Sequence, residues 1–193
     1  MKTKPLDRPI SFLFERMLRR MEKRYDYDFS YVRHLWHVSR PAFRRFMYGF
    51  MWFSQGRDAL PPEAGAVAGI VATMHADCGP CTQITVNMAL EKGVDPAILR
   101  ATVAGDLASL GPDLAAVFEF TRAVTAADYS ATELRERVRS LYGEKSLVDL
   151  GTVIAAAQVY PMLKRTLGYG EACLKVRVAG EDVTARRATA EAA

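Results

Sequence analysis

Residues 62–93 read PEAGAVAGIVATMHADCGPCTQITVNMALEKG, and this stretch decides the fold. Small apolar side chains fill its first half and recur at steps of three and four residues, the spacing of one helix face. The residues in question are Val67, Ile70, Val71 and Met74. The pattern predicts a helix over residues 62–76. Asp77 is expected to cap a second helix, which carries two cysteines and ends near Gly93.

The same helical spacing extends outward from this stretch in both directions. It predicts helices over residues 10–23, 32–36 and 41–51 upstream, and over 112–120, 134–141 and 147–167 downstream, with a short helix opening at residues 95–96. Ser130 and Glu133 have the spacing of a capping box before the helix over 134–141. Alternating patterns are scarce, and only residues 175–178 resemble a short strand. The predicted fold class is therefore all-α.

Composition limits the class of protein. The 193 residues are enough for one packed domain, and half of them are hydrophobic, which excludes a disordered chain. No continuous apolar run approaches the roughly 20 residues that a membrane helix needs, so no membrane span is expected. The charged residues 1–8 do not have the character of a signal peptide, and the expected location is cytoplasmic.

Charge and aromatic residues divide the chain unevenly. Residues 1–58 contain 13 Lys and Arg against 6 Asp and Glu, and 13 of the 19 aromatic residues. We therefore separate a basic, aromatic N-terminal segment (1–58), a cysteine-containing helical domain (59–173) and a polar tail (174–193). Nucleic-acid binding and a membrane-surface helix are alternatives for the first segment. Packing against the core or a neighbouring subunit is favoured, because aromatic residues and Arg are typical of interfaces.

Cys78 and Cys81 form a C-x-x-C pair, the feature with the clearest chemical meaning. A thiolate in the first turn of a helix is stabilised by unpaired N–H groups and by the helix dipole. One cysteine can then attack an oxidant and the other can trap the product as a disulfide. We expect this pair to face solvent. His75 is in range by sequence to assist the thiolate.

Three alternatives for the cysteines stay open. Both could be buried and inert, since cysteine is among the most buried residue types. His75, Cys78, Cys81 and the distant Cys173 could also bind zinc, although a single C-x-x-C is weak support. The letters Cys-Gly-Pro-Cys also occur in thioredoxin, but the preceding run has helical rather than strand periodicity, which disfavours that fold.

A wider pattern carries a family resemblance: an apolar helix, C-x-x-C at the next helix start, Gly93 fifteen residues after Cys78, and then Val-Asp-Pro. In these features the chain resembles the alkylhydroperoxidase D-like branch of the carboxymuconolactone decarboxylase family. The resemblance implies an all-α helical bundle, here with an extra N-terminal helical segment, that assembles as trimers or hexamers and reduces hydroperoxides. Cys81 would be the attacking thiol and Cys78 the resolving thiol.

Two positions depart from that family pattern. The branch usually has a His four residues after the second cysteine, where this chain has Thr85, and a Glu twelve residues before the first, where it has Ala66. Those groups relay protons to and from the thiol. Glu63, one turn earlier on the same predicted helix, and His75 are the candidate substitutes.

The predicted function is a thiol-dependent peroxidase or disulfide oxidoreductase. Its candidate catalytic residues are Cys81, Cys78, His75 and Glu63. It needs no metal or organic cofactor, takes a hydroperoxide or disulfide as substrate, and depends on a dithiol protein or small thiol as reductant. We also expect a homo-oligomer. The alternatives are a non-enzymatic, redox-responsive interaction protein on the same fold and a zinc-stabilised binding protein.

Overall fold

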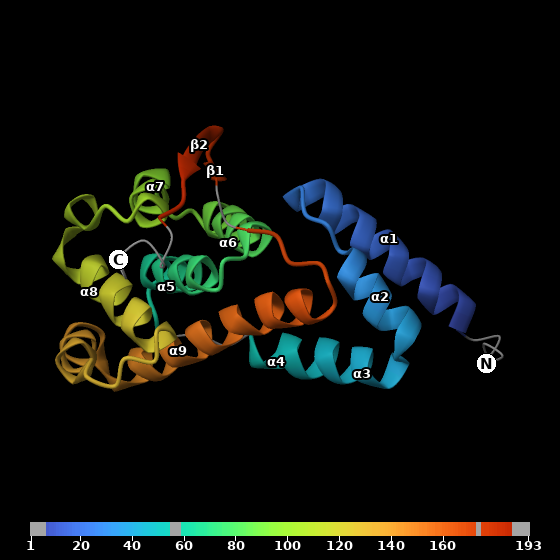
Figure 1. The fold of residues 1–193 in the computed structure, drawn as a ribbon, viewed down its shortest axis with the longest axis horizontal. Helices are drawn as coiled ribbons and strands as arrows, with labels where there is room; N and C mark the ends of the chain where they lie inside the picture. The colour runs from blue at the N-terminus through green and yellow to red at the C-terminus, as the bar shows by residue number, and fades with distance from the viewer. Residues whose placement is uncertain (1–6, 55–58, 173–174, 187–193) are drawn as a thin grey trace.

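The computed structural model of the chain describes residues 7–54, 59–172 and 175–186, with side chains from residue 12 onward. It is predominantly helical, which confirms the all-α prediction (Figure 1). The helices are α1 (Asp7–Tyr25), α2 (Ser30–Val38), α3 (Arg40–Arg44), the π-helical turn η1 (Arg45–Phe50), α4 (Met51–Phe53), α5 (Pro62–His75), α6 (Gly79–Glu91), α7 (Pro96–Ala104), α8 (Leu107–Thr125) and α9 (Thr132–Thr166). A hairpin of β1 (Lys175–Val178) and β2 (Glu181–Thr184) follows.

Helix α5 lies at the centre of the fold and packs against α6, α7, α8 and α9. The sequence predicted one apolar face, but α5 is buried on nearly all sides, from Ala64 through Met74. Small side chains make this possible because they let neighbouring helices approach closely. At Gly69 an added Cβ would lie only 3.1 Å from the Thr85 methyl of α6, so α5 and α6 are in tight contact there.

Two predicted helix caps are wrong. Asp77 has φ 47° and ends α5 in a left-handed conformation, with its N–H bonded to Met74 O at 2.9 Å, so Cys78 becomes the N-cap residue of α6. Ser130 does not cap α9, because its hydroxyl and its N–H both bond to the Asp128 carboxylate and Ala131 takes the N-cap position. At Ser130, a short polar side chain closes a local turn instead of a helix end.

Glycines with positive φ interrupt two long helical segments. Gly111, with φ 72°, divides α8 next to Pro112, the position where the sequence predicted a helix start. Gly143, with φ 84°, divides α9 into a short first part and a long second part. The second part, which ends at Thr166, agrees with the helix predicted over residues 147–167.

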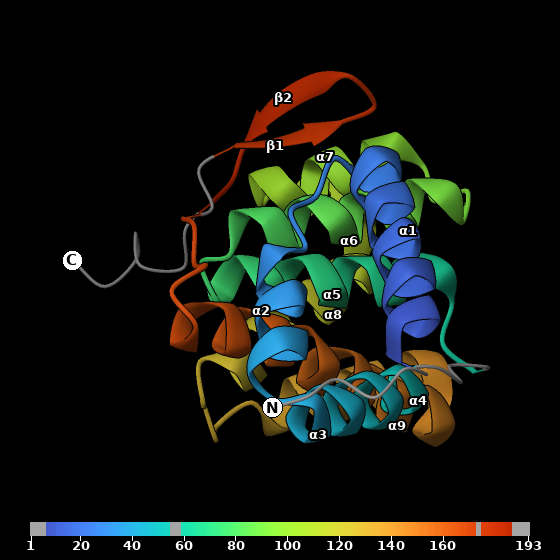
Figure 2. The same cartoon turned by 90° about the vertical axis from the view of Figure 1, so that its right-hand side faces the viewer.

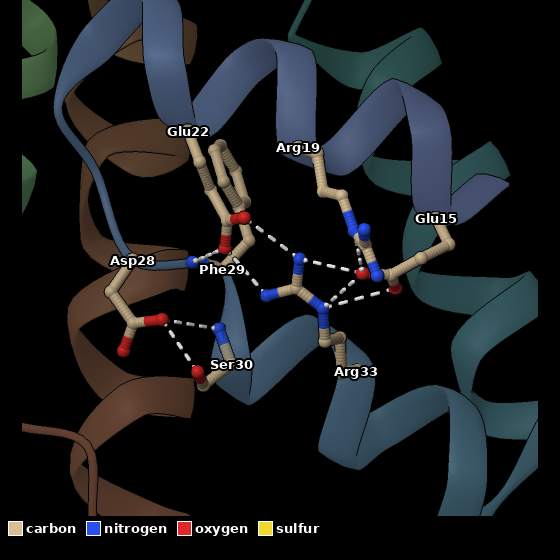
Figure 3. A network of polar contacts seen from close by, with 7 residues as sticks. All are labelled: Glu15, Arg19, Glu22, Asp28, Phe29, Ser30 and Arg33. Atoms are coloured by element: carbon tan, nitrogen blue, oxygen red, sulfur yellow. Dashed lines mark hydrogen bonds and ion pairs between the residues drawn. The ribbon is translucent and has the colours of Figure 1, made fainter.

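The N-terminal helices form an aromatic cluster against α6 and α9 (Figures 1 and 2). Its buried members are Leu18, Tyr27, Phe29, Tyr31, Val32 and Phe43. Arg33 of α2 joins α1 to α2, since its guanidinium lies between the carboxylates of Glu15 and Glu22 (Figure 3). Glu91 of α6 accepts hydrogen bonds from Arg24 and Tyr25 at the end of α1. The segment is thus attached to the core by apolar and polar contacts.

The predicted strand over residues 175–178 is confirmed, and the structure adds an antiparallel partner that the sequence did not indicate. Val176 pairs with Val183, and Val178 with Glu181. Val176 and Val178 are fully buried in a cluster with residues of α5, α6 and α7. The hairpin therefore covers one edge of the helical core.

By length and composition, α9 is a candidate membrane span, with 33% of its most apolar window buried inside the protein. Core helices of globular proteins pass the same test, so this is weak support for a span. The expected absence of a membrane span stays a prediction.

Candidate functional site

The two cysteines lie at the N-terminus of α6 and form a disulfide. Cys78 is the N-cap residue, and Cys81 lies three residues further, in the first helical turn. Their Cα atoms are 5.2 Å apart, within the range in which a disulfide forms without backbone movement. Pro80 fits between them because N–H groups of the first turn have no intrahelical partner. The local backbone therefore brings both sulfurs together.

The disulfide is buried, which corrects the expectation that the pair faces solvent. Cys78 and Cys81 are each 3% exposed. The chain that leaves α9 crosses this helix start, where Gly79 N–H donates to Glu171 O at 3.1 Å. One turn later, the Gln83 side-chain amide donates to Arg177 O at 2.8 Å and accepts from Arg177 N–H at 2.7 Å. The C-terminal segment is therefore hydrogen-bonded to α6 at both Gly79 and Gln83.

The two positions at which the sequence departs from the resembled family pattern contain no acid or base. Thr85, at the position of the usual His, donates its hydroxyl to Cys81 O at 2.8 Å. Ala66, at the position of the usual Glu, is buried within the α5–α6 packing. With Gly69 in contact range of the Thr85 methyl, the interface is filled by small side chains. A relay through this interface is absent because neither position has an ionisable group.

His75 lies at the end of α5, three residues before Cys78 along the chain. The turn between them is fixed, because Cys78 N–H donates to Thr73 O at 3.2 Å. Burial lowers the pKa of His75 below its usual 6.5, and the backbone of Thr125 partly opposes that shift. Within the described part of the chain, Nδ1 of His75 is buried without a hydrogen-bond partner. His75 is therefore a neutral base near the cysteines in sequence.

The structure does not bring Glu63 to the cysteines. Glu63 lies in the first turn of α5, whereas Cys78 follows the last turn of the same helix. At 1.5 Å per residue, the length of α5 separates them by roughly 18 Å. Burial raises the pKa of Tyr142 at the far end of the bundle, and the negative charges of Asp113 and Glu63 raise it further. Glu63 is thus too distant to exchange a proton with the thiols directly.

A buried cation was missed by the sequence analysis. Lys164 of α9 is 2% exposed, and its ammonium lies 4.8 Å from the ring centre of Tyr27 and 5.4 Å from that of Tyr31. Burial lowers the pKa of Lys164, while the charge of Glu171 opposes this. Burial also raises the pKa of Tyr27 to about 12. The sequence signal was a single Lys on the apolar side of α9, between Tyr160 and Leu167.

No group of three or more His, Cys, Asp or Glu side chains with metal-binding geometry occurs in residues 12–54, 59–172 and 175–186. The proposed zinc ligand Cys173 lies outside the described residues. The two sulfurs within them are bonded to each other. The zinc hypothesis therefore gains no ligand set from the described residues.

Comparison with protein-family models, curated proteins and solved structures finds no match to this chain. The family resemblance stays a prediction that depends on the motif.

Proposed function

We propose that this protein is a dithiol–disulfide oxidoreductase that reduces a hydroperoxide or a disulfide through Cys78 and Cys81. The observation that carries the proposal is the Cys78–Cys81 disulfide at the first turn of α6. This position favours the thiolate of the reduced pair, because the helix N-terminus has a positive end charge and unpaired N–H groups. No metal or organic cofactor enters the chemistry.

With a hydroperoxide, the reduced pair reacts in two steps. The Cys81 thiolate attacks the outer oxygen, an S–O bond forms, the O–O bond breaks, and the alkoxide takes a proton to leave as an alcohol. The Cys78 sulfur then attacks the sulfenic acid of Cys81. An S–S bond forms, the S–O bond breaks, and the hydroxyl leaves as water with the proton of the Cys78 thiol. An external dithiol reduces the disulfide by two exchange steps and is itself oxidised.

His75 is the residue proposed to hold the thiol proton. Its pKa is lowered by burial, so its imidazole is neutral at pH 7 and can accept a proton. Thr85 and Ala66 cannot take this role. Glu63 is excluded by its distance along α5. Replacement of His75 should therefore slow thiolate formation, and the rate should recover as the pH rises toward the ordinary cysteine pKa of about 8.5.

The proposed reaction requires that a substrate can reach the sulfurs of Cys78 and Cys81. Both cysteines are 3% exposed, so the proposed reaction requires neighbouring residues to move, and we propose that residues 167–172, which bond to the helix start at Gly79, are the segment that separates. Residues 167–172 are held by the hydrogen bond from Gly79 N–H to Glu171 O, by the contact of Tyr169 Oη with His34 Nδ1 at 3.1 Å, and by the packing of Leu167 and Tyr169 in the aromatic cluster, so their separation from α6 breaks several contacts.

The same burial supports a second candidate, a redox-responsive interaction protein without turnover. In that case, reduction and oxidation of Cys78 and Cys81 would change how residues 167–172 lie on α6, and thereby change the affinity for a partner.

Turnover distinguishes the two candidates. We expect the wild-type protein to consume an organic hydroperoxide with dithiothreitol as reductant, and Cys81→Ser and Cys78→Ser to lose this activity. Cys173→Ser is the matched control, with one thiol removed outside the pair. Equal rates for wild type and Cys81→Ser would overturn the enzyme proposal. A disulfide that forms and is reduced reversibly, without turnover, would favour the second candidate.

A further inference from the structure

Helix α1 presents a cationic face to solvent. The exposed cations among its described side chains are Arg16, Arg19, Arg20, Lys23 and Arg24. At 100° per residue they lie on the side of the helix away from Leu18, which is 1% exposed and belongs to the aromatic cluster. Figures 1 and 2 place α1 at the edge of the molecule, with α2 beside it. The cationic face therefore points away from the protein.

The acidic residues of α1 do not neutralise this face. Glu15 and Glu22 turn toward α2, where Arg33 donates to their carboxylates at 3.1 Å and 2.8 Å (Figure 3). Both carboxylates are partly buried by this contact. The two acids of the described helix are thus used for attachment to α2, and the positive charge is left on the outer side.

Three of the five exposed cations make no ion pair within the part of the chain that the structure describes. They are Arg16, Arg20 and Lys23, whereas Arg24 contacts Glu91 of α6 at 2.6 Å. These three side chains are therefore available to an anionic partner.

An apolar row runs beside the cations. An open groove of about 350 Å³ on α1 is lined by one row of Leu13, Met17 and Met21 and by a second row of Arg16, Arg20 and Arg24. Within each row the step is four residues, about 6 Å along the helix axis. Leu13 is 65% exposed, and Phe12 before it is 67% exposed. The outer face of α1 thus combines positive charge with exposed apolar side chains.

The positive charge selects an anionic partner, and the apolar row favours a lipid surface over other polyanions. Nucleic acid would use the cations too, but its bases stack on rings, and Phe12 is the one ring among the exposed described residues of α1. At a bilayer, Leu, Met and Phe side chains can enter the acyl boundary. Arg and Lys then extend their apolar stems and keep the charge among the headgroups.

The density of charge is that of lipid-binding segments. Residues 1–24 contain eight Lys and Arg against three Asp and Glu. Clusters of four to eight cations on an amphipathic helix are typical of segments that bind anionic lipids. Each cation near such a surface strengthens binding about fivefold, so Arg16, Arg20 and Lys23 together contribute about 100-fold.

We propose that α1 binds the surface of an anionic phospholipid bilayer. The helix lies along the surface with Phe12, Leu13 and Met17 at the acyl boundary and its cations among the headgroups. Its inward face stays packed against the protein, because the two faces are on opposite sides of the helix. This binding needs no membrane-spanning segment and does not depend on the redox chemistry proposed above.

Sedimentation with vesicles tests the charge. Wild type should bind vesicles of phosphatidylcholine with about one third phosphatidylserine, and should not bind vesicles of phosphatidylcholine alone. A variant with Arg16→Gln, Arg20→Gln and Lys23→Gln should bind the anionic vesicles about 100-fold more weakly. The fold should be retained, since all three side chains are exposed.

The matched control is a variant with Arg135→Gln, Arg137→Gln and Arg139→Gln. These exposed residues belong to the first part of α9, at the opposite end of the molecule from α1 (Figure 1). The control loses the same net charge and should bind anionic vesicles nearly as tightly as wild type. Equal loss of binding in both variants would overturn the proposal, because net charge and not α1 would then determine the attachment.

A second variant tests the apolar contact. Phe12→Gln with Leu13→Gln retains every charge and should bind anionic vesicles at least about tenfold more weakly, since two apolar side chains no longer enter the acyl boundary. Three results would contradict the proposal. They are unchanged vesicle binding by this variant or by the variant of Arg16, Arg20 and Lys23, equal binding of wild type to neutral and anionic vesicles, and tighter binding of wild type to a single-stranded oligonucleotide than to the vesicles.

Discussion

Reduction of the Cys78–Cys81 disulfide should destabilise the protein by a small, calculable amount. The bond closes a loop with a sequence separation of only 3. In the chain-entropy account, such a short loop contributes about 2 kcal/mol, because the unfolded chain loses little freedom when it is closed. The reduced cysteines can remain where they are, since they are buried in the folded chain and a protonated thiol brings no charge into the core. For a chain of 193 residues, this corresponds to a decrease in Tm of about 4–8 °C.

The measurement is thermal unfolding followed by circular dichroism, with and without a phosphine reductant. A variant with Cys78→Ala and Cys81→Ala should show no response to reductant, and Cys173→Ser should respond as wild type does. No change in Tm for wild type would mean that the disulfide is absent in solution, and the reasoning would fail. A decrease above about 15 °C would also refute it, because reduction would then release far more structure than a four-residue loop.

Three further changes probe the packing and the charges. Arg33→Met should reduce the free energy of unfolding by about 1–2 kcal/mol in urea titrations at neutral pH, a value discounted for partial exposure. Arg33 lowers the pKa of Glu22 below 4.5, so this stabilisation is present above that pH and is lost as the pH falls through the lowered pKa; a difference unchanged at pH 2 would contradict it. Gly69→Ala should destabilise wild type but not a Thr85→Ser background, which lacks the methyl 3.1 Å from the new Cβ; equal effects in both would exclude that contact. Because burial lowers the pKa of His75 from 6.5, the unfolded state takes up this proton first. Stability should therefore decrease as the pH falls below about 7, and His75→Gln should flatten that profile in chemical denaturation.

Periodicity predicted the helices well because a single local rule governs them. Apolar spacing located α1, α5, α6 and the second part of α9, and Gly111 was correctly placed at a break. The caps failed because the backbone of Asp77 takes a left-handed conformation and the hydroxyl of Ser130 bonds to the Asp128 carboxylate, and short polar side chains of this kind have several local partners. The C-x-x-C spacing predicted that the sulfurs of Cys78 and Cys81 could reach each other, and the disulfide confirms that geometry.

The burial of that disulfide could not be predicted from local sequence. One contact at this helix start joins Gly79 to Glu171, residues separated by most of the downstream chain, and no local pattern encodes such a pairing. The buried ammonium of Lys164 has the same origin, because Tyr27 and Tyr31 come from the opposite end of the sequence. Both features result from the closing contacts of the fold, where long-range topology determines which side chains leave water.

The packing of α5 against α6 explains why Ala66 and Thr85 depart from the family pattern. Thr85 contacts α5 at Gly69, where even one added carbon would be crowded, and its hydroxyl is occupied by Cys81 O. An imidazole at residue 85 would be far larger than the space between these helices. Small residues at this interface and the absence of the usual Glu and His therefore have one cause. The helices α5 and α6 can approach this closely only when neither larger side chain lies between them. In the oxidoreductase proposed above, a proton released by Cys81 would therefore have to leave by another side of the helix start, where His75 is the proposed acceptor.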